Sequence, residues 1–254
     1  MIVQAQVRRF TDEVVDSRKD DVLEEAPVAL VYNGISHVVM MATPVDLKDF
    51  AYGFSLSEGI VDDVSGIFAV ETAPAACGVE VNIEISQRYM SRLRERRRQM
   101  AGSSGCGLCG VEALEQLVTP INKVIPLHLE KSAVQASLAQ LPEFQPLRSR
   151  TGASHVAAFC STSGDIRFAF EDVGRHNALD KMLGHWARSP DPGFALVSSR
   201  ASYEMVYKVC RLGFGALIAV SAPTSMAVDL AHQAGLNLIG FARPGRYQQY
   251  LSLC

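Results

Sequence analysis

Long apolar runs and an excess of basic charge are both missing from this sequence of 254 residues. No apolar run approaches the roughly 18 residues that a membrane-spanning helix needs. The stretch from Met1 to Glu13 lacks the apolar segment of a secretory signal. The net charge of −3 does not suit a dedicated nucleic-acid binder. We therefore expect a soluble cytoplasmic protein that binds neither a membrane nor a nucleic acid.

The cysteines do not follow the pattern of a structural zinc site. Cys106 and Cys109 form a Cys-x-x-Cys pair, but the other four cysteines and the six histidines show no second paired spacing. A structural zinc ion needs four ligands, so we assign no metal. In a reducing cytoplasm the cysteines are expected to be free thiols. The sequence therefore points to thiol chemistry.

The Cys106–Cys109 pair stands in a segment whose glycines and serines predict a mobile loop, residues 101–110. The apolar-periodic residues 111–117 predict a helix directly after it. Both sulfurs would then lie near a helix N-terminus, where unpaired N–H groups and the helix dipole favour a thiolate. We predict that the nucleophile is partly ionised at neutral pH.

Two reactions suit such a pair. A dithiol oxidoreductase uses Cys-x-x-Cys before a helix, although no thioredoxin-like βαβ unit leads into this loop. Sulfur transfer needs a reactive thiolate on a flexible arm, which attacks a donor persulfide and presents the terminal sulfur elsewhere. In the second case Cys109 is either held away from the persulfide or acts as a relay. Both reactions remain open on the residues alone, as does a non-catalytic role as a cofactor chaperone.

The first hundred residues are predicted to form an α+β region. Apolar segments flank Asn33-Gly34, a pair typical of a type I′ turn, and predict a hairpin over residues 27–41. A capping-box-like start at Thr43 predicts a helix to about Glu58. Alternation over residues 79–85 predicts a strand. Residues 86–100 predict a helix with six arginines, which form either a solvated face or a surface for an acidic partner.

The second half of the chain predicts an α/β domain. Strands at 194–199, 216–222 and 237–242 alternate with helices at about 202–212 and 225–234, as in right-handed βαβ crossovers of a parallel sheet. Before them we predict a helix over 131–141 that ends at Pro142, a hairpin over 154–173, and a helix over 176–188.

Hydroxyls and arginines follow the three predicted parallel strands. The segments are 198–202, 221–225 and 241–246, and they include Arg200, Arg243 and Arg246. Ligands bind beyond the carboxyl ends of such strands, where helix N-termini point outward. A pyrophosphate or nucleotide would suit this edge, with Phe241 as a stacking surface. The alternative is that the hydroxyls only cap helices and the arginines are only solvated.

The stretch Glu171–Asn177 packs two carboxylates, a cation, an imidazole and an amide into seven residues at a predicted strand-to-helix turn. We expect it to border the same edge. Alternatively, Asp172 and Asn177 are capping and turn residues. His155 is a weaker candidate, since a histidine among apolar residues is as often part of the core.

Taken together, the motifs resemble those of the formate dehydrogenase accessory sulfurtransferase family, FdhD. They occur in the family's order and cover the chain from about residue 27 to its end. The matching stretches are 105–110 (GCGLCG), 151–158 (TGASHVAA), 171–181 (EDVGRHNALDK), 198–205 (SSRASYEM), 221–225 (SAPTS) and 240–246 (GFARPGR).

The resemblance implies a carrier that takes sulfur from a cysteine desulfurase as a persulfide on Cys106. It passes the sulfur to the molybdenum bis(molybdopterin guanine dinucleotide) cofactor, which formate dehydrogenase then receives; a guanine nucleotide would be a partial mimic. It also implies a homodimer and a cytidine-deaminase-like mixed sheet with flanking helices. The candidate catalytic residues are Cys106 and Cys109, and the candidate cofactor-binding residues are Phe241, Ala242, Arg243, Pro244, Gly245, Arg246, Arg200, Ser221 and His176.

Ala153 and Ser199 stand where the family commonly has glycine, which affects backbone geometry near the ligand. Deamination is not expected despite the fold, because no glutamate follows His176 by two residues to act as general acid and base. We divide the chain into an α+β region (1–100), the loop (101–110) and a cofactor-binding α/β domain (111–254).

Overall fold

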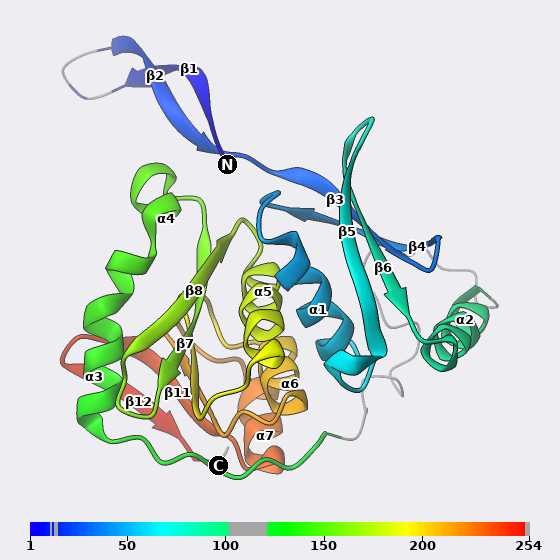
Figure 1. Ribbon diagram of the computed structural model, residues 1–254. Helices are drawn as coiled ribbons and strands as arrows, with labels where there is room; N and C mark the ends of the chain where they lie inside the picture. The colour runs from blue at the N-terminus through cyan, green and yellow to red at the C-terminus, as the bar shows by residue number, and fades with distance from the viewer. Residues whose placement is uncertain (11, 13–14, 102–120, 252–254) are drawn as a thin grey trace.

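The computed structural model describes residues 1–10, 12, 15–101 and 121–251. Within them the chain forms a mixed α/β fold with three sheets and seven α-helices (Figure 1). Cys106, Cys109 and the helix predicted over 111–117 lie outside the described residues, so these predictions stay predictions. The division into three regions and the likeness to cytidine deaminases also stay predictions.

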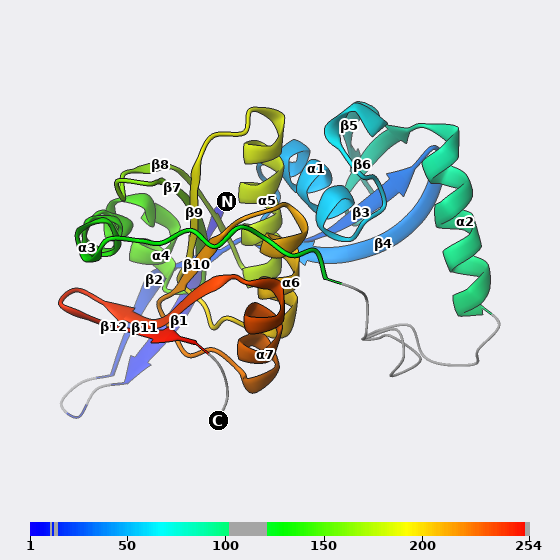
Figure 2. The same cartoon turned by 90° about the horizontal axis from the view of Figure 1, so that it is seen from below.

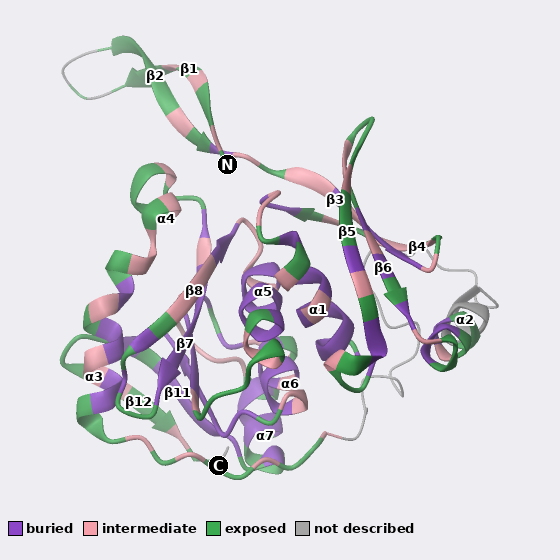
Figure 3. Cartoon of the chain, viewed as in Figure 1, coloured by how far each residue is buried: buried purple, intermediate pink, exposed green. Residues whose placement is uncertain are grey.

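The chain begins with a hairpin that the sequence analysis missed. Strands β1 (Ile2–Phe10) and β2 (Val15–Leu23) pair in antiparallel register and project from the body of the molecule (Figure 1). Most of their side chains are exposed or half-buried, as the green and pink ribbon shows in Figure 3. Arg150 of helix α4 (Pro146–Thr151) forms an ion pair with Asp21 at 2.6 Å, which ties the base of the hairpin to the body.

A four-stranded sheet follows, with strand order β4-β3-β6-β5. Its strands are β3 (Ala26–Tyr32), β4 (Ile35–Ala42), β5 (Ile67–Ala75) and β6 (Gly78–Ile85). The predicted hairpin is confirmed: Asn33 and Gly34 have φ angles of 46° and 77°, as a type I′ turn requires. The predicted strand at 79–85 is confirmed as β6. The sheet buries one face against helix α1 (Leu47–Ser57). Strand β5 was not predicted.

Helix α1 (Leu47–Ser57) begins later than the predicted start near Thr43. Thr43 is fully buried, and its backbone N–H donates to Asp172 while its carbonyl accepts from Lys181. These long-range bonds hold Thr43 outside the helix. The helix ends close to the predicted residue, with Gly59 in the left-handed region at φ 67°. Helix η1 (Val64–Gly66) leads into β5, and the predicted arginine-rich helix is confirmed as α2 (Gln87–Ala101).

The six-stranded sheet has the order β12-β11-β10-β9-β7-β8. As predicted, β9 (Gly193–Val197), β10 (Ala216–Ala219) and β11 (Asn237–Arg243) are parallel. The predicted hairpin over 154–173 is confirmed as β7 (His155–Ser161) and β8 (Ile166–Asp172), and β7 runs antiparallel to β9. The final strand, β12 (Arg246–Tyr250), was not predicted.

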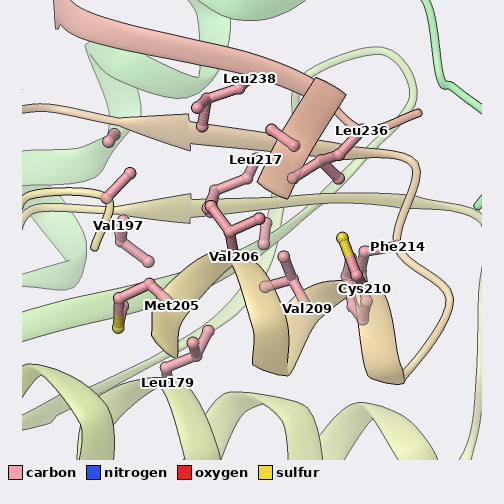
Figure 4. Close-up of a cluster of buried hydrophobic side chains, with 14 of the residues drawn as sticks. Leu179, Val197, Met205, Val206, Val209, Cys210, Phe214, Leu217, Leu236 and Leu238 are labelled. Atoms are coloured by element: carbon pink, nitrogen blue, oxygen red, sulfur yellow. The ribbon is translucent and has the colours of Figure 1, made fainter. Parts of the chain in front are cut away.

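Helices cover both faces of this sheet (Figure 2). On one side are α5 (Arg175–Arg188), α6 (Tyr203–Arg211) and α7 (Ser225–Ala234), each within two residues of its predicted bounds. Figure 4 shows Val206 and Val209 of α6 packed beside Leu217 of β10 in this core. The opposite face packs on α3 (Lys131–Gln140). The helix predicted to end at Pro142 stops at Gln140 and continues as η3 (Leu141–Phe144), before α4 (Pro146–Thr151).

Helices α1 and α5 join the smaller sheet to the larger one at very close range. A Cβ atom added to Gly53 would lie 1.7 Å from the carbonyl oxygen of Asp180, and one added to Gly184 would lie 2.0 Å from that of Asp49. Only glycine allows the two backbones to approach this closely. Among the described residues, no helix has the length and apolar character that a membrane span needs.

Candidate functional site

The carboxyl ends of β9, β10 and β11 lie side by side, as predicted. Phe241 N–H donates to Ser221 O at 3.0 Å, and Thr224 N–H donates to Ala201 O at 3.0 Å. Ala201 and Pro223 also form an isolated parallel bridge. Residues 198–202, 221–225 and 241–246 therefore form one continuous edge, here called the strand-end site.

One of the three loops differs from the prediction. The first two lead into helices α6 and α7, but residues Arg243–Arg246 form the turn between β11 and β12. Gly245 occupies the left-handed region there, with φ 85°. The positive helix ends expected at this edge are therefore supplied by α6 and α7 alone, because a strand follows the third loop.

Phe241 has an unusual backbone for an aromatic residue. It sits in a register shift between Gly240 and Arg243, and its φ is 50°. A non-glycine residue in this region stores strain of roughly 1–3 kcal/mol, and such strain collects at functional sites. The residue is 47% exposed, which leaves it open to a ligand.

The predicted arginines differ in how much of their hydrogen-bonding capacity is used. Arg243 donates to the carbonyl oxygens of Val220 and Ala242, the latter at 2.9 Å. Arg200 and Arg246 are exposed and, among the described residues, form no ion pair. The strand-end site also contains no acidic residue. It therefore presents unneutralised positive charge, which suits an anion.

The carboxylates of Glu171 and Asp172 are occupied by structural contacts. Glu171 accepts from the backbone N–H groups of Leu147 and Arg148 at 2.7 and 2.9 Å, at the start of α4. Asp172 accepts from Gly174 N–H at 2.8 Å and from the Asn177 amide at 3.0 Å. It also pairs with the fully buried Lys181 at 2.7 Å. The capping and turn interpretation of Asp172 and Asn177 therefore describes their contacts in the structure.

Histidines 155 and 176 flank these carboxylates. His155 starts β7, next to Ser198, whose hydroxyl accepts from Val156 N–H at 3.0 Å. His176 lies in the first turn of α5, and its Nε2 is 3.9 Å from Glu204 Oε2 of α6. Burial, followed by the charge of Arg175, lowers the pKa of His155 and lowers that of His176 to about 4. Both imidazoles are therefore neutral at pH 7, and His176 borders the strand-end site through α6.

The sequence analysis did not predict a buried ionic cluster that joins α6, α5 and the end of α1. Lys208 of α6 donates to Asp180 of α5 at 2.8 Å and to Ser57 at 2.8 Å, and it pairs with Glu58 at 2.7 Å. Lys208 and Asp180 are almost fully enclosed. Their positions on otherwise apolar helix faces were a signal: Lys208 follows Met205 by three residues, on the same face of α6.

The other described cysteines do not provide a reactive thiol of the predicted kind. Cys160 and Cys210 are buried, and burial raises the pKa of both, that of Cys210 to about 12. Cys77 is exposed in the turn between β5 and β6. Within the part of the chain that the structure describes, no three histidine, cysteine or acidic residues cluster in a way that could hold a metal ion.

Comparisons with known proteins agree on one family. A family model described as the FdhD/NarQ family matches residues 23–252. The sulfur carrier protein FdhD of Cupriavidus necator is 50% identical over 237 residues, which are 91% of this chain and 82% of the relative. A crystal structure from Desulfotalea psychrophila, provisionally described as a formate dehydrogenase accessory protein, superposes with a TM-score of 0.80 over 98% of this chain and 96% of its own. That structure is 20% identical, so it supports the fold alone.

Proposed function

Because the chain belongs to the FdhD/NarQ family, we propose that it is a sulfurtransferase that accepts sulfur from a cysteine desulfurase as a persulfide on Cys106. It transfers this sulfur to the molybdenum bis(molybdopterin guanine dinucleotide) cofactor, on which formate dehydrogenase activity depends. The observation that carries the proposal is the 50% identity to a sulfur carrier protein over nine-tenths of the chain. We propose that the protein acts as a homodimer in the cytoplasm.

The first step is thiol–disulfide-type exchange. The Cys106 thiolate attacks the terminal sulfur of the donor persulfide, and the S–S bond of the donor breaks as the new one forms. The donor cysteine leaves as a thiolate, so charge and electrons balance. In delivery, the terminal sulfur leaves Cys106 as a zero-valent atom and Cys106 returns to a thiolate. The acceptor supplies the two electrons that make this atom a sulfide ligand.

The strand-end site suits the nucleotide portions of the cofactor. Its exposed Arg200 and Arg246 are bidentate donors of the kind that bind pyrophosphate, and the start of α6 and α7 adds two positive helix ends. The strained and exposed Phe241 offers a ring on which a base can stack. These observations support the proposed roles of Phe241–Arg246, Arg200 and Ser221 as cofactor-binding residues.

Mass spectrometry after incubation with a cysteine desulfurase and cysteine tests the sulfur carrier role. We expect an adduct of about 32 Da, one sulfur atom, on Cys106. The adduct should be absent from Cys106→Ala and present in Cys77→Ala, a matched control at another exposed cysteine. A disulfide between Cys106 and Cys109 in place of the adduct would instead support a dithiol oxidoreductase.

Binding of GDP, a partial mimic of the cofactor, tests the second site separately. We expect the affinity to be retained in Cys106→Ala and to fall about tenfold or more in Arg246→Ala, because a charge-assisted bond to phosphate is lost. Arg167→Ala, an exposed arginine on β8, is the matched control. Equal affinity in Arg246→Ala, Arg200→Ala and the wild type would place the nucleotide elsewhere.

A further inference from the structure

The projecting hairpin of β1 and β2 carries exposed apolar side chains at its outer end. Phe10 and Val15 are cross-strand partners, so their side chains lie on the same face, and they are 72% and 61% exposed. A lone two-stranded hairpin is only marginally stable in water, and gathered exposed apolar groups mark interaction sites. Within the described part of the chain, the outer end of this hairpin therefore has no covering partner.

The face that carries Phe10 is also basic. Because side chains alternate along a strand, Arg8 and Lys19 share this face, and both are exposed. Neither forms an ion pair with a described residue. On the opposite face of the hairpin, Arg18 lies 4.0 Å from Asp20, so charge is balanced there. The basic hairpin face consists of Gln6, Arg8, Phe10, Val15, Ser17 and Lys19.

The four-stranded sheet leaves one of its faces open in the described structure. Its inner face packs on α1 and buries residues such as Leu30, whereas the alternate residues point outward. Val39 and Met41 of the edge strand β4 are 57% and 49% exposed. In the register of the sheet, Ala29 lies between Val39 and Glu80. The outer face therefore places the apolar side chains of β4 close to a carboxylate of β6.

The charge of this outer face has one sign. Strands β3 to β6 contain three glutamates and neither a lysine nor an arginine. Glu80 and Glu84 alternate with the buried Val81 and Ile83, and Glu71 pairs with the outward-facing position between them. All three carboxylates are exposed, and none has an ion-pair partner among the described residues. We call this surface the acidic sheet face.

We propose that the basic hairpin face of one copy docks on the acidic sheet face of a second copy, and that a two-fold axis repeats the contact in reverse; this rests on the proposed homodimer. The apolar end of the hairpin covers the apolar side chains of β4, while Arg8 and Lys19 meet the glutamates. The occupant is a second copy because the hairpin and the sheet of one chain extend in opposite directions (Figures 1 and 2).

The area of the two contacts suits a dimer. A nine-residue strand is about 30 Å long and a two-stranded ribbon is about 10 Å wide, so one hairpin face offers about 300 Å². Across a two-fold axis each copy contributes one hairpin face and one sheet face. The four faces together bury about 1,200 Å², the lower limit for a stable interface. A hairpin that contacted only solvent would make no difference to association.

Sedimentation velocity of the full-length protein at several concentrations measures the dissociation constant of the dimer. We expect it to rise about tenfold or more in Arg8→Glu with Lys19→Glu, because each attraction becomes a repulsion and occurs twice per dimer. Adding Glu80→Lys and Glu84→Lys to the same chain reverses both faces, so it should restore most of the affinity. Added salt should weaken the wild-type dimer.

Arg18→Glu, on the opposite face of the hairpin, is the matched control and should leave the dissociation constant unchanged. Rescue by the second pair of substitutions separates a lost contact from a misfolded hairpin. A dissociation constant that stayed at the wild-type value in Arg8→Glu with Lys19→Glu would overturn the inference while leaving the homodimer intact. Weakening without rescue would place the hairpin on another surface and overturn it too. A wild type that remained monomeric would overturn both the homodimer and the inference.

Discussion

At the scale of single residues, substitutions of Phe241 change stability through its backbone conformation and change nucleotide binding through loss of its ring. Its φ of 50° suits glycine, whereas alanine is as strained there as phenylalanine. We predict that Phe241→Gly is more stable than Phe241→Ala by about 1 kcal/mol, the reverse of their usual order. Both variants lose the ring and should bind GDP equally weakly. Urea denaturation and nucleotide titration measure the two effects, and a less stable glycine variant would contradict the assigned strain.

The buried pair of Asp180 and Lys208 gives a second prediction at this scale. Removing Asp180 leaves an ammonium group enclosed beside a single, half-exposed Glu58 carboxylate. We expect Asp180→Ala to lower the free energy of unfolding by about 3–5 kcal/mol. Replacing both partners, as Asp180→Leu with Lys208→Met, should recover much of this loss.

Chemical denaturation of Asp180→Leu, of Lys208→Met and of the variant that carries both gives their coupling energy. Asp229→Ala, on the exposed side of α7, serves as the control and should stay within about 0.5 kcal/mol of the wild type. If the single and double variants lost stability additively, the pair would not be coupled.

At the scale of elements, the contact between α1 and α5 should make a glycine-to-alanine substitution destabilising. In most helix interiors, replacing glycine by alanine stabilises the protein by about 1 kcal/mol. The added methyl of Gly53→Ala would meet the carbonyl oxygen of Asp180, so the helices would have to separate. We predict a net loss of about 1–3 kcal/mol, measured by chemical denaturation. A more stable variant would mean that the two backbones are farther apart.

Sequence reasoning found the elements whose burial requires apolar residues in a regular pattern along the sequence. Strands β9, β10 and β11 are apolar and are separated by glycines that end helices, so they could be placed. In contrast, β2 (VDSRKDDVL) and β12 (RYQQY) are exposed, polar strands without alternation. Their pairing depends on a neighbouring strand, which a local pattern cannot reveal.

The same reasoning explains which site residues could be predicted. The edge formed by β9, β10 and β11 follows from parallel topology, which places equivalent ends together. The Lys208 cluster joins residues 28 and 151 positions apart, and no local pattern specifies such a pairing. The delayed start of α1 has a similar cause, because Thr43 is held by Asp172 and Lys181.

At the scale of the whole molecule, the two neutral histidines make stability sensitive to mild acid. An unfolded histidine takes up a proton near pH 6.5, whereas folded His176 does so only near pH 4. Between these values the unfolded chain binds more protons, so stability falls as the pH is lowered from about 6.5 to 4. The folded pKa of His155 is also lowered, which acts in the same direction.

We therefore predict that the thermal midpoint falls from pH 7 to pH 5, and that His176→Gln shows a smaller fall because one of the two histidines is removed. Thermal unfolding at several pH values measures this. His232→Gln, an exposed histidine in α7, should behave as the wild type does. Identical pH profiles for His176→Gln and the wild type would show that His176 is not the responsible group.

The joined helices α1 and α5 also have a consequence for how the chain is made. The side chains at the end of α1 find their partners 123 and 151 residues later, at Asp180 and Lys208. At synthesis rates of 5–20 residues per second, the side of α1 that packs against α5 and α6 leaves the ribosome about 6–30 s before those helices can cover it. The nascent protein is thus exposed to aggregation in that interval, and its yield in the cell should depend on holding chaperones more than its final stability suggests.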